Sequence, residues 1–480
     1  VIRVSVDADG IEGNGPSAEL SRAIISADGR YVAFDSAADN LIAGDLNGVA
    51  DVFLYDRDSD GNEIFDEPGG IAVSRISLGP GGVEANARSF GPALSGDNRF
   101  VVFTSAAGNF GGGSGVEQIY LRDREAQQTV LLSRDDAGIP GNGDSGQASI
   151  SDDGRYVVYQ STADNLVAGD SNGVSDIFLH DRDSDGNGVF DEAGGFHTLL
   201  VSRNGVGALA NGANLEPMIA ANGRYIVFAS DANNLTSNDT QLCGALTCRD
   251  IFLLDRDSDD NGVFDEPGGI SITLVSRSSD GATGNGHSYG PSISGDGSGI
   301  VFGTDGDNLF NDSNSRSDVV VYFPGVRETE ALSRTLDGQQ AQGDSRDGVI
   351  SPAGNSVILS SDADNLVAAD NNGERDVFYR SVGEDHPVNE EFGPSHPGQP
   401  GLGAPQETEE GPDPLGVRYL ALGSLWYYLH DWVSKDLFLP PNQFTAFDRR
   451  TSIDFNRIGR ERQASGVFSA DARFEANTRA

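Results

Sequence analysis

Three closely similar acidic segments carry the side chains of this sequence that are best suited to chemistry. They are DRDSDGNEIFDE from Asp56, DRDSDGNGVFDE from Asp181 and DRDSDDNGVFDE from Asp255. Each segment places carboxylates at positions 1, 3 and 5, a turn-forming residue at position 6 and a glutamate at position 12, which are oxygen donors of the kind that Ca²⁺ binds. Because so many carboxylates in one short segment repel one another without a cation, we expect each segment to bind calcium.

The predicted ligands recur at the same positions of each segment, with position 7 binding through its backbone carbonyl. They are Asp56, Asp58, Asp60, Asn62 and Glu67 in the first segment, Asp181, Asp183, Asp185, Asn187 and Glu192 in the second, and Asp255, Asp257, Asp259, Asn261 and Glu266 in the third. Asp66, Asp191 and Asp265 are candidates to compete with the final glutamate. The alternative is that the segments are acidic hairpin turns without a metal.

The spacing of these carboxylates is that of the EF-hand loop, with three departures. No flanking helices are expected, Asp260 replaces glycine in the third copy, and the apolar pair stands at positions 9 and 10. The segments therefore resemble the DxDxDG calcium loops that are inserted in secreted β-domains.

A second polar phrase recurs as GDLNGVAD (Asp45 to Asp51), GDSNGVSD (Asp170 to Asp176) and ADNNGERD (Asp370 to Asp376), with Asn47, Asn172 and Asn372 inside the three copies. Asp-x-Asn-Gly phrases commonly form turns closed by their own side chains, and cation binding is the alternative.

The elements that position these segments are repeats. SADGRYVAF at Ser26 is followed by counterparts at Ser95, Ser151, Ala220, Ser294 and Ser351, which makes six copies. After most copies come a DNL phrase, a polar loop, a segment such as DVFLYD, and then VSR or LSR. Apolar and polar residues alternate over these segments, and Gly, Asp and Asn lie between them, so each unit is predicted to be a small antiparallel sheet.

Six such sheets cannot bury their faces alone, and stacking them around an axis predicts an all-β, six-bladed β-propeller. The first residues, VIRVSVDADG, align with LVSRSSDGAT at Leu274, the last strand of a unit, whereas the final unit ends at DVFYRSVG without that strand. We therefore predict that the N-terminal strand completes blade six and closes the ring.

The phrase S-x-D-G-R-Y-V-A-F followed by D-V-F-L-Y-D-R resembles the PD40 (WD40-like) repeat of TolB-like six-bladed propellers. The resemblance covers residues 1–383. It implies the propeller architecture and a choice of activities, since TolB-like propellers include periplasmic binding proteins, non-catalytic domains beside peptidases, and lyases.

Charge excludes several classes of partner. The net charge of −42 repels nucleic acid and anionic lipid and favours divalent cations or basic proteins. No apolar run is long enough to span a bilayer. The chain begins at Val1 and its single methionine is Met218, so we expect a signal peptide to have been removed. Cys243 and Cys248 are the two cysteines and are expected to form a local disulfide, which favours an extracellular or periplasmic location.

The sequence gives catalysis little support. Its six histidines form no HxH or HExxH pattern, and most Ser and Asp residues recur at equivalent positions of the repeats. Glycine-rich runs such as GGGSG at Gly111 do not precede a Lys-Ser/Thr pair, so a phosphate-binding loop is not expected.

The chain changes character after residue 383. Residues 384–412 are rich in Pro, Gly and acidic residues and are predicted to be a linker. Residues 413–480 are predicted to form an arm with one amphipathic helix, whose apolar residues include Trp426, and two strand-like stretches, TSIDFNRI and GVFSADARFEA. Residues 444–480 have a net charge of +2, which leaves −44 for the rest of the chain. The arm is expected to dock on its own propeller, on a neighbouring copy or on a different protein.

These features together predict a non-catalytic, secreted, calcium-binding propeller that serves as a structural or protein-interaction subunit, for example of a cell-surface assembly or filament. The arm is expected to mediate self-association or binding to another surface protein. The alternatives are a propeller enzyme, such as a polysaccharide lyase or hydrolase or a peptidase-associated domain, and a TolB-like periplasmic adaptor.

Overall fold

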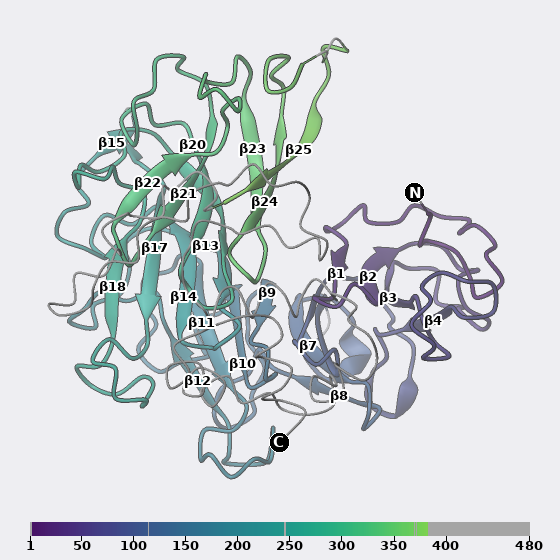
Figure 1. Ribbon diagram of the computed structural model, residues 1–480. Helices are drawn as coiled ribbons and strands as arrows, with labels where there is room; N and C mark the ends of the chain where they lie inside the picture. The colour runs from purple at the N-terminus through teal and green to yellow at the C-terminus, as the bar shows by residue number, and fades with distance from the viewer. Residues whose placement is uncertain (1, 114, 244–245, 369, 371, 383–480) are drawn as a thin grey trace, which may run out of the picture. The chain divides into compact units, whose positions relative to one another are not determined.

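A computed structural model describes residues 2–113, 115–243, 246–368, 370 and 372–382. Regular structure in this part of the chain consists of strands β1 to β25 and two short 3₁₀ turns, η1 (Pro80–Gly82) and η2 (Gly108–Phe110). The all-β six-bladed propeller is confirmed (Figure 1). The predicted linker and arm, including the amphipathic helix and both tryptophans, lie outside the described residues. In the described part, no helix has the length and apolar character needed to cross a membrane.

Each blade is an antiparallel sheet whose strands follow one another in chain order. Blade one contains β1 (Ile24–Ile25), β2 (Tyr31–Ser36), β3 (Asp51–Asp56) and β4 (Ala72–Arg75), and blade two contains β5 (Ser89–Leu94), β6 (Phe100–Ser105), β7 (Gln118–Asp123) and β8 (Gln128–Leu131). Blade three contains β9 (Ser145–Ile150), β10 (Tyr156–Ser161), β11 (Asp176–Asp181) and β12 (His197–Leu200). Blade four contains β13 (Asn214–Ile219), β14 (Tyr225–Ser230), β17 (Asp250–Asp255) and β18 (Ser271–Leu274). Blade five contains β19 (Ser288–Ile293), β20 (Ile300–Thr304), β21 (Asp318–Phe323) and β22 (Glu328–Ala331), and blade six contains β23 (Ser345–Ile350), β24 (Ser356–Ser361) and β25 (Asp376–Ser381).

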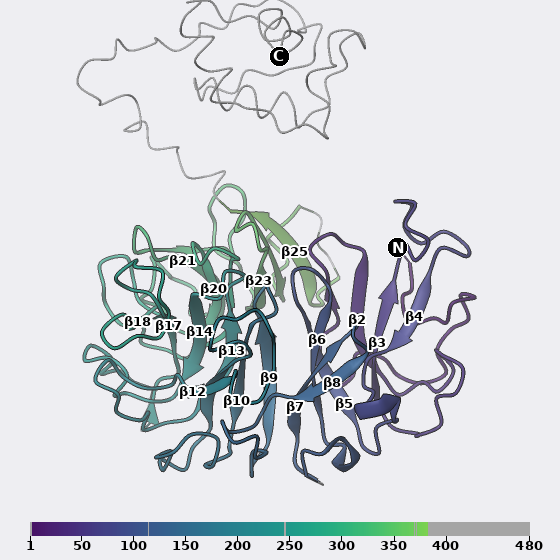
Figure 2. The same cartoon turned by 90° about the horizontal axis from the view of Figure 1, so that it is seen from below.

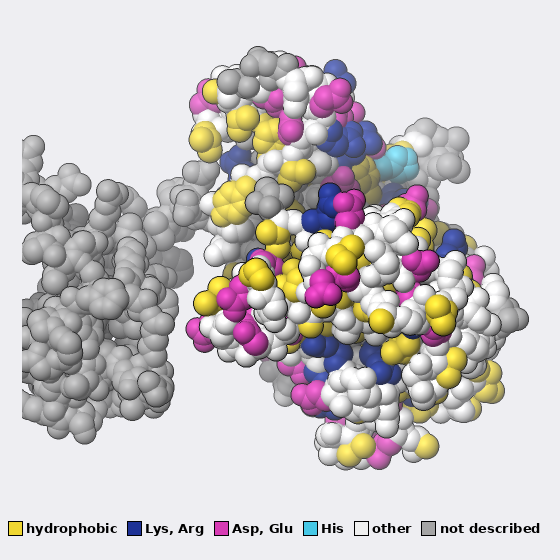
Figure 3. Space-filling view, turned by 90° about the vertical axis from the view of Figure 1, so that its right-hand side faces the viewer, with side chains coloured by type: hydrophobic (Ala, Val, Ile, Leu, Met, Phe, Trp, Pro, Cys, Tyr) yellow, Lys and Arg dark blue, Asp and Glu magenta, His cyan; other side chains and the backbone are white. Residues whose placement is uncertain are grey.

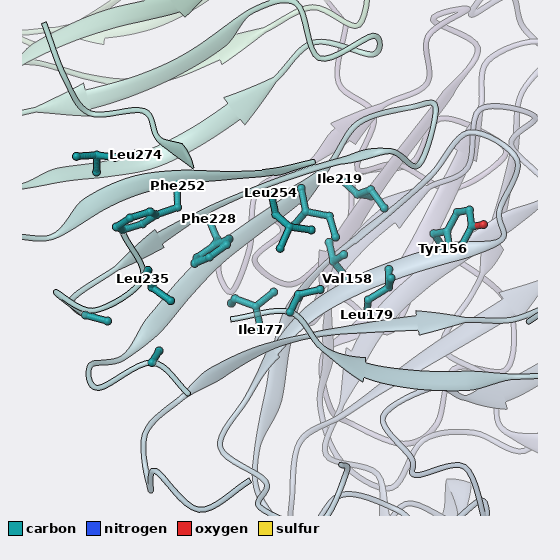
Figure 4. Close-up of a cluster of buried hydrophobic side chains, with 14 residues drawn as sticks. Tyr156, Val158, Ile177, Leu179, Ile219, Phe228, Leu235, Phe252, Leu254 and Leu274 are labelled. Carbon is teal, nitrogen blue, oxygen red and sulfur yellow. The ribbon is translucent and has the colours of Figure 1, made fainter. Parts of the chain in front are cut away.

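The core lies between successive blades. In blades one to five the second and third strands are largely buried on both faces, so their sequences, such as FVVFTS in β6, are almost continuously apolar. Between blades three and four, for example, Ile177 and Leu179 of β11 pack in one cluster with Phe228 of β14 and Phe252 of β17 (Figure 4). Similar clusters lie between blades one and two, two and three, four and five, and five and six. Figure 2 shows strands of neighbouring blades side by side, such as β9 and β10 of blade three and β13 and β14 of blade four.

Blade six differs from the others, and the predicted closing strand is wrong for the described residues. Its sheet has three strands, with β25 outermost. Residues 2–7 form no strand with β25, because this segment is fastened to blade one instead. The Ser5 carbonyl accepts a hydrogen bond from the Gly13 backbone at 3.0 Å, and Val4 and Val6 pack in a cluster with Phe34 and Phe53.

The face of blade six that would meet blade one remains exposed. Val377 and Tyr379 of β25 correspond to Ile177 and Leu179 of β11, which are fully buried, yet they are 75% and 68% exposed. Ile358 of β24, on the same face, is 49% exposed. Arg22 of blade one forms an ion pair with Asp347 of blade six, but the apolar cluster of blade one contains no residue of blade six. The ring therefore has a seam between blades six and one.

Candidate functional site

The three acidic segments are long connections between the third and fourth strands of blades one, three and four. Blades two and five join the same strands by four-residue turns, residues 124–127 and 324–327. The acidic segments are therefore insertions at one edge of an otherwise common blade.

The first aspartate of each segment is held by an arginine of its own blade. Arg30 binds both oxygens of Asp56, at 2.7 and 2.9 Å, and the same bidentate ion pair joins Arg155 to Asp181 and Arg224 to Asp255. Blade two has no acidic segment and still has this pair, between Arg99 and Asp123. The pair thus belongs to the blade, and the ligand set available to a cation is narrower than predicted.

The candidates to compete with the final glutamate are also held by arginines. Arg57 binds Asp66, Arg182 binds Asp191 and Arg256 binds Asp265. The same arginines donate to backbone carbonyls at the start of the second strand, as in the Arg182 Nη1 bond to the Gly154 carbonyl at 2.6 Å. These arginines were not among the predicted site residues, although the recurring phrase D-R-D-S-D places one at the second position of each acidic segment.

Two of these arginines connect the acidic segments to the preceding blade. Arg182 of blade three lies over the ring of Phe100 in blade two at 4.3 Å, and Arg256 of blade four lies over the ring of Tyr156 in blade three at 4.0 Å. Arg256 is 0% exposed. Because a guanidinium over an aromatic ring is stabilising, the conformation of each of these segments is coupled to an interface between blades.

The remaining predicted residues come together around the asparagine. Asp58 is buried, and its two oxygens accept hydrogen bonds from the backbone of Asn62 and Glu63 at 2.9 and 3.1 Å. The Asn62 side-chain Nδ2 donates to Asp60 at 3.1 Å and to Glu67. The same network recurs with Asp183, Asp185, Asn187 and Glu192 and with Asp257, Asp259, Asn261 and Glu266.

Each loop has left-handed residues at two places. Position 6 of the predicted loops is Gly61, Gly186 or Asp260, with φ of 71°, 69° and 58°, and two residues later Glu63, Gly188 and Gly262 have φ of 67°, 82° and 83°. A left-handed residue at position 6 makes the sharp turn that a calcium loop requires.

The donor set fits a hard cation once the asparagine amide turns. In each described loop, an amide N–H donor stands between two carboxylates, and no three His, Cys, Asp or Glu side chains lie together as a metal site in the part of the chain that the structure describes. Turning the amide would present its oxygen beside those of Asp60 and Glu67, at the cost of the Asn62 Oδ1 bond to the Ile64 backbone. Calcium would then meet oxygen donors alone.

The second polar phrase forms turns closed by their own side chains. Asn47 donates to Asp51 at 2.6 Å, Asn172 to Asp176 at 2.7 Å and Asn372 to Asp376 at 3.1 Å. This is the arrangement expected of an Asp-x-Asn-Gly turn. The predicted disulfide between Cys243 and Cys248 is confirmed and spans the small hairpin of β15 (Leu242–Cys243) and β16 (Leu246–Thr247).

Catalytic residues would require a polar recess. A cavity of about 280 Å³ lies at the junction of blades one and two, and Glu19, Asp35 and Arg88 are its charged lining residues. Asp35 is occupied there by hydrogen bonds from the Ser21 hydroxyl and the Leu20 backbone.

His180, a buried residue of β11, makes the propeller sensitive to acid. Burial, together with the positive charges of Arg134 and Arg182, lowers the pKa of His180 well below its ordinary value. The unfolded chain binds a proton that the folded protein excludes, so stability is lost as the pH falls below about 6.5, by up to ~1.4 kcal/mol per pH unit. We expect His180→Leu, which introduces the residue that blade four has at Leu254, to flatten this dependence in denaturant titrations between pH 7 and 5. A His180→Leu profile as steep as that of the natural chain would contradict the assignment.

Known proteins share only distant similarity with this chain. No protein-family profile matches the chain, and no curated protein matches it significantly. Among solved structures, it is similar to a putative TolB from Agrobacterium tumefaciens, at 15% identity over 75% of this chain and 89% of that chain with a TM-score of 0.36. It is also similar to an oligogalacturonate lyase in complex with manganese, at 11% identity over 74% and 75% of the two chains with a TM-score of 0.39. The β-propeller domain of the Trilobed protease from Pyrococcus furiosus matches at 10% identity over 76% and 81%, with a TM-score of 0.42. At these identities the likeness concerns the fold alone.

Proposed function

We propose that this protein is a secreted, calcium-stabilised, non-catalytic propeller that serves as a structural or protein-interaction subunit, such as a component of a cell-surface assembly or filament. The observation that carries the proposal is the incomplete sixth blade. A sheet whose outermost strand exposes large apolar side chains offers a partner both backbone pairing and apolar contact. Acidic and hydrophobic side chains are both visible on the outer surface (Figure 3).

The chain itself supplies a candidate partner for blade six. Blade six is one strand short in the described residues, and the arm contains two strand-like stretches, residues 451–458 and 466–476, in a segment of net positive charge. The propeller is strongly acidic, so charge favours the approach of this segment. We propose that the arm of a neighbouring copy completes blade six, which would join copies in series.

One further observation supports the alternative that the protein is an enzyme. The cavity lined by Glu19, Asp35 and Arg88 holds two carboxylates and a guanidinium that do not recur in every blade. A propeller lyase or hydrolase would use such a non-repeated set. A TolB-like periplasmic adaptor is compatible with the proposed interaction role and differs from it in the partner.

Charges placed on the exposed face of blade six test the proposal. We expect Ile358→Lys with Val377→Lys to abolish self-association in light scattering, because two charges on the exposed apolar face of β24 and β25 disfavour apolar contact with another chain. Val206→Lys, at a residue that is 91% exposed elsewhere, is the matched control and should associate normally. A large loss of melting temperature without a change in association would instead show that this face closes against blade one of the same chain.

A further inference from the structure

Paired aspartates precede and begin the third strand of several blades, and in blade one a guanidinium lies between them. Arg75 Nη1 is 2.9 Å from Asp45 Oδ1 and 3.4 Å from Asp51 Oδ2, and Arg75 Nη2 donates to Glu84 at 2.5 Å. The side chains of Asp45 and Asp51 are 2% and 0% exposed. One nitrogen atom reaches both carboxylates, so the two side chains converge on a single cation position.

Blade four has the same aspartate–serine hydrogen bond and the same strand register, but it lacks the arginine. The Asp250 carboxylate Oδ1 accepts from the Ser276 hydroxyl at 2.5 Å, as Asp51 Oδ1 does from Ser77 in blade one. The backbone registers also correspond, since Phe252 pairs with Leu274 as Phe53 pairs with Arg75. The position that supplies the guanidinium in blade one is therefore a leucine in blade four.

The carboxylates of blade four are left without that counter-charge. Asp239 and Asp250 are 4% and 0% exposed, and within the described residues Asp239 Oδ2 and Asp250 Oδ2 are buried without a hydrogen-bond partner. A buried carboxylate oxygen without a partner is costly, and this cost is removed when a cation binds it.

We infer that a divalent cation of the calcium type binds between Asp239 and Asp250 of blade four, in the place that the Arg75 guanidinium occupies in blade one. The two carboxylates supply the negative charge, and backbone carbonyls and water are the usual further ligands of Ca²⁺. The disulfide between Cys243 and Cys248 lies between the two aspartates in the chain.

The aspartates of blades three and five show why we assign the cation to blade four. In blade three, Asp176 is satisfied by Ser202, Asn172 and Asn214. In blade five, Ala331 stands at the arginine position, and Asp312 Oδ2 and Asp318 Oδ2 are likewise buried without a partner among the described residues. Asp312 is, however, only partly buried, and Arg334 places a positive charge near Asp318. In blade four both aspartates are buried, and within the described residues neither forms an ion pair.

The test is a count of bound calcium on the full chain, by equilibrium dialysis with elemental analysis. The double variant Asp239→Asn with Asp250→Asn should bind one calcium equivalent less than the natural protein. Without calcium, the double variant should melt at a higher temperature than the natural protein, because the repulsion between the two carboxylates is gone. Asp185→Asn with Glu192→Gln, in the acidic loop of blade three, separates this site from the loop sites, because it leaves the blade-four equivalent in place.

A second variant tests the same inference from the opposite side. Arg75→Leu introduces the residue that blades three and four have at Leu200 and Leu274, and it leaves Asp45, Asp51 and Glu84 without their guanidinium. We expect this variant to gain one calcium equivalent. An unchanged count in the Asp239/Asp250 variant, or no gain in Arg75→Leu, would overturn the inference.

Discussion

Removal of calcium is expected to lower the melting temperature of the propeller by on the order of 10 °C. Each site saturated at a hundred times its Kd stabilises the folded chain by about 2.7 kcal/mol, and three loops contribute together. The effect should spread beyond the loops, because Arg182 and Arg256 connect two of them to aromatic rings of the preceding blades. Differential scanning calorimetry with and without a chelator measures this change in melting temperature.

Loop variants assign this effect to residues. Asp185→Asn with Glu192→Gln keeps the shape of the side chains that meet Asn187 and removes their charge, so the part of the calcium-dependent gain that the three loops supply should fall by about a third. Glu125→Gln, in the short turn of blade two at the equivalent edge, is the matched control and should behave as the natural chain. Equal melting temperatures with and without chelator, together with no bound calcium, would refute the loop assignment.

Removal of residues 386–480 is expected to convert a self-associating protein into a monomer. The described propeller contains its own apolar clusters, so the truncated chain should fold with a nearly unchanged melting temperature. The natural chain should show a mass in light scattering that rises with concentration, because the proposed arm-to-blade contact joins one copy to the next.

An isolated peptide of residues 444–480 gives the complementary measurement. It should bind the truncated propeller, and Ile358→Lys with Val377→Lys should weaken that binding at least tenfold. A reversed-sequence peptide of the same composition and charge is the control for non-specific attraction to an acidic protein. A full-length protein that stays monomeric at all concentrations would contradict the proposal. So would a peptide that binds the Ile358→Lys, Val377→Lys variant as tightly as it binds the unchanged propeller.

The propeller was predictable because its repeats constrain it at every level. Strands such as β6 and β11 are buried on both faces, which requires short and nearly continuous apolar runs, and these runs recur visibly in the sequence. The local disulfide was predictable for a similar reason, since the cysteines lie close together and no others compete with them.

The acidic segments connect the third and fourth strands of their blades, and their calcium ligands stay a prediction. Asp56 ends a strand and also begins an acidic run, and sequence spacing does not distinguish a ligand from the partner of Arg30. Blade two held the signal, because Arg99 and Asp123 recur there without an acidic segment. The closing strand was mispredicted since alignment of a phrase identifies a strand-like segment, whereas its pairing depends on whether two distant blade faces pack together.

Because of the seam between blades six and one, the series of blades has two ends, blade one and blade six. In a fully closed ring every blade is supported on both sides, and unfolding must break two interfaces at once. An array with ends behaves as a one-dimensional series of nearest-neighbour couplings, in which terminal units open first and central units last. Amide protons of blades three and four, where two of the acidic loops and the disulfide lie, should then exchange most slowly, and those of blade six most quickly.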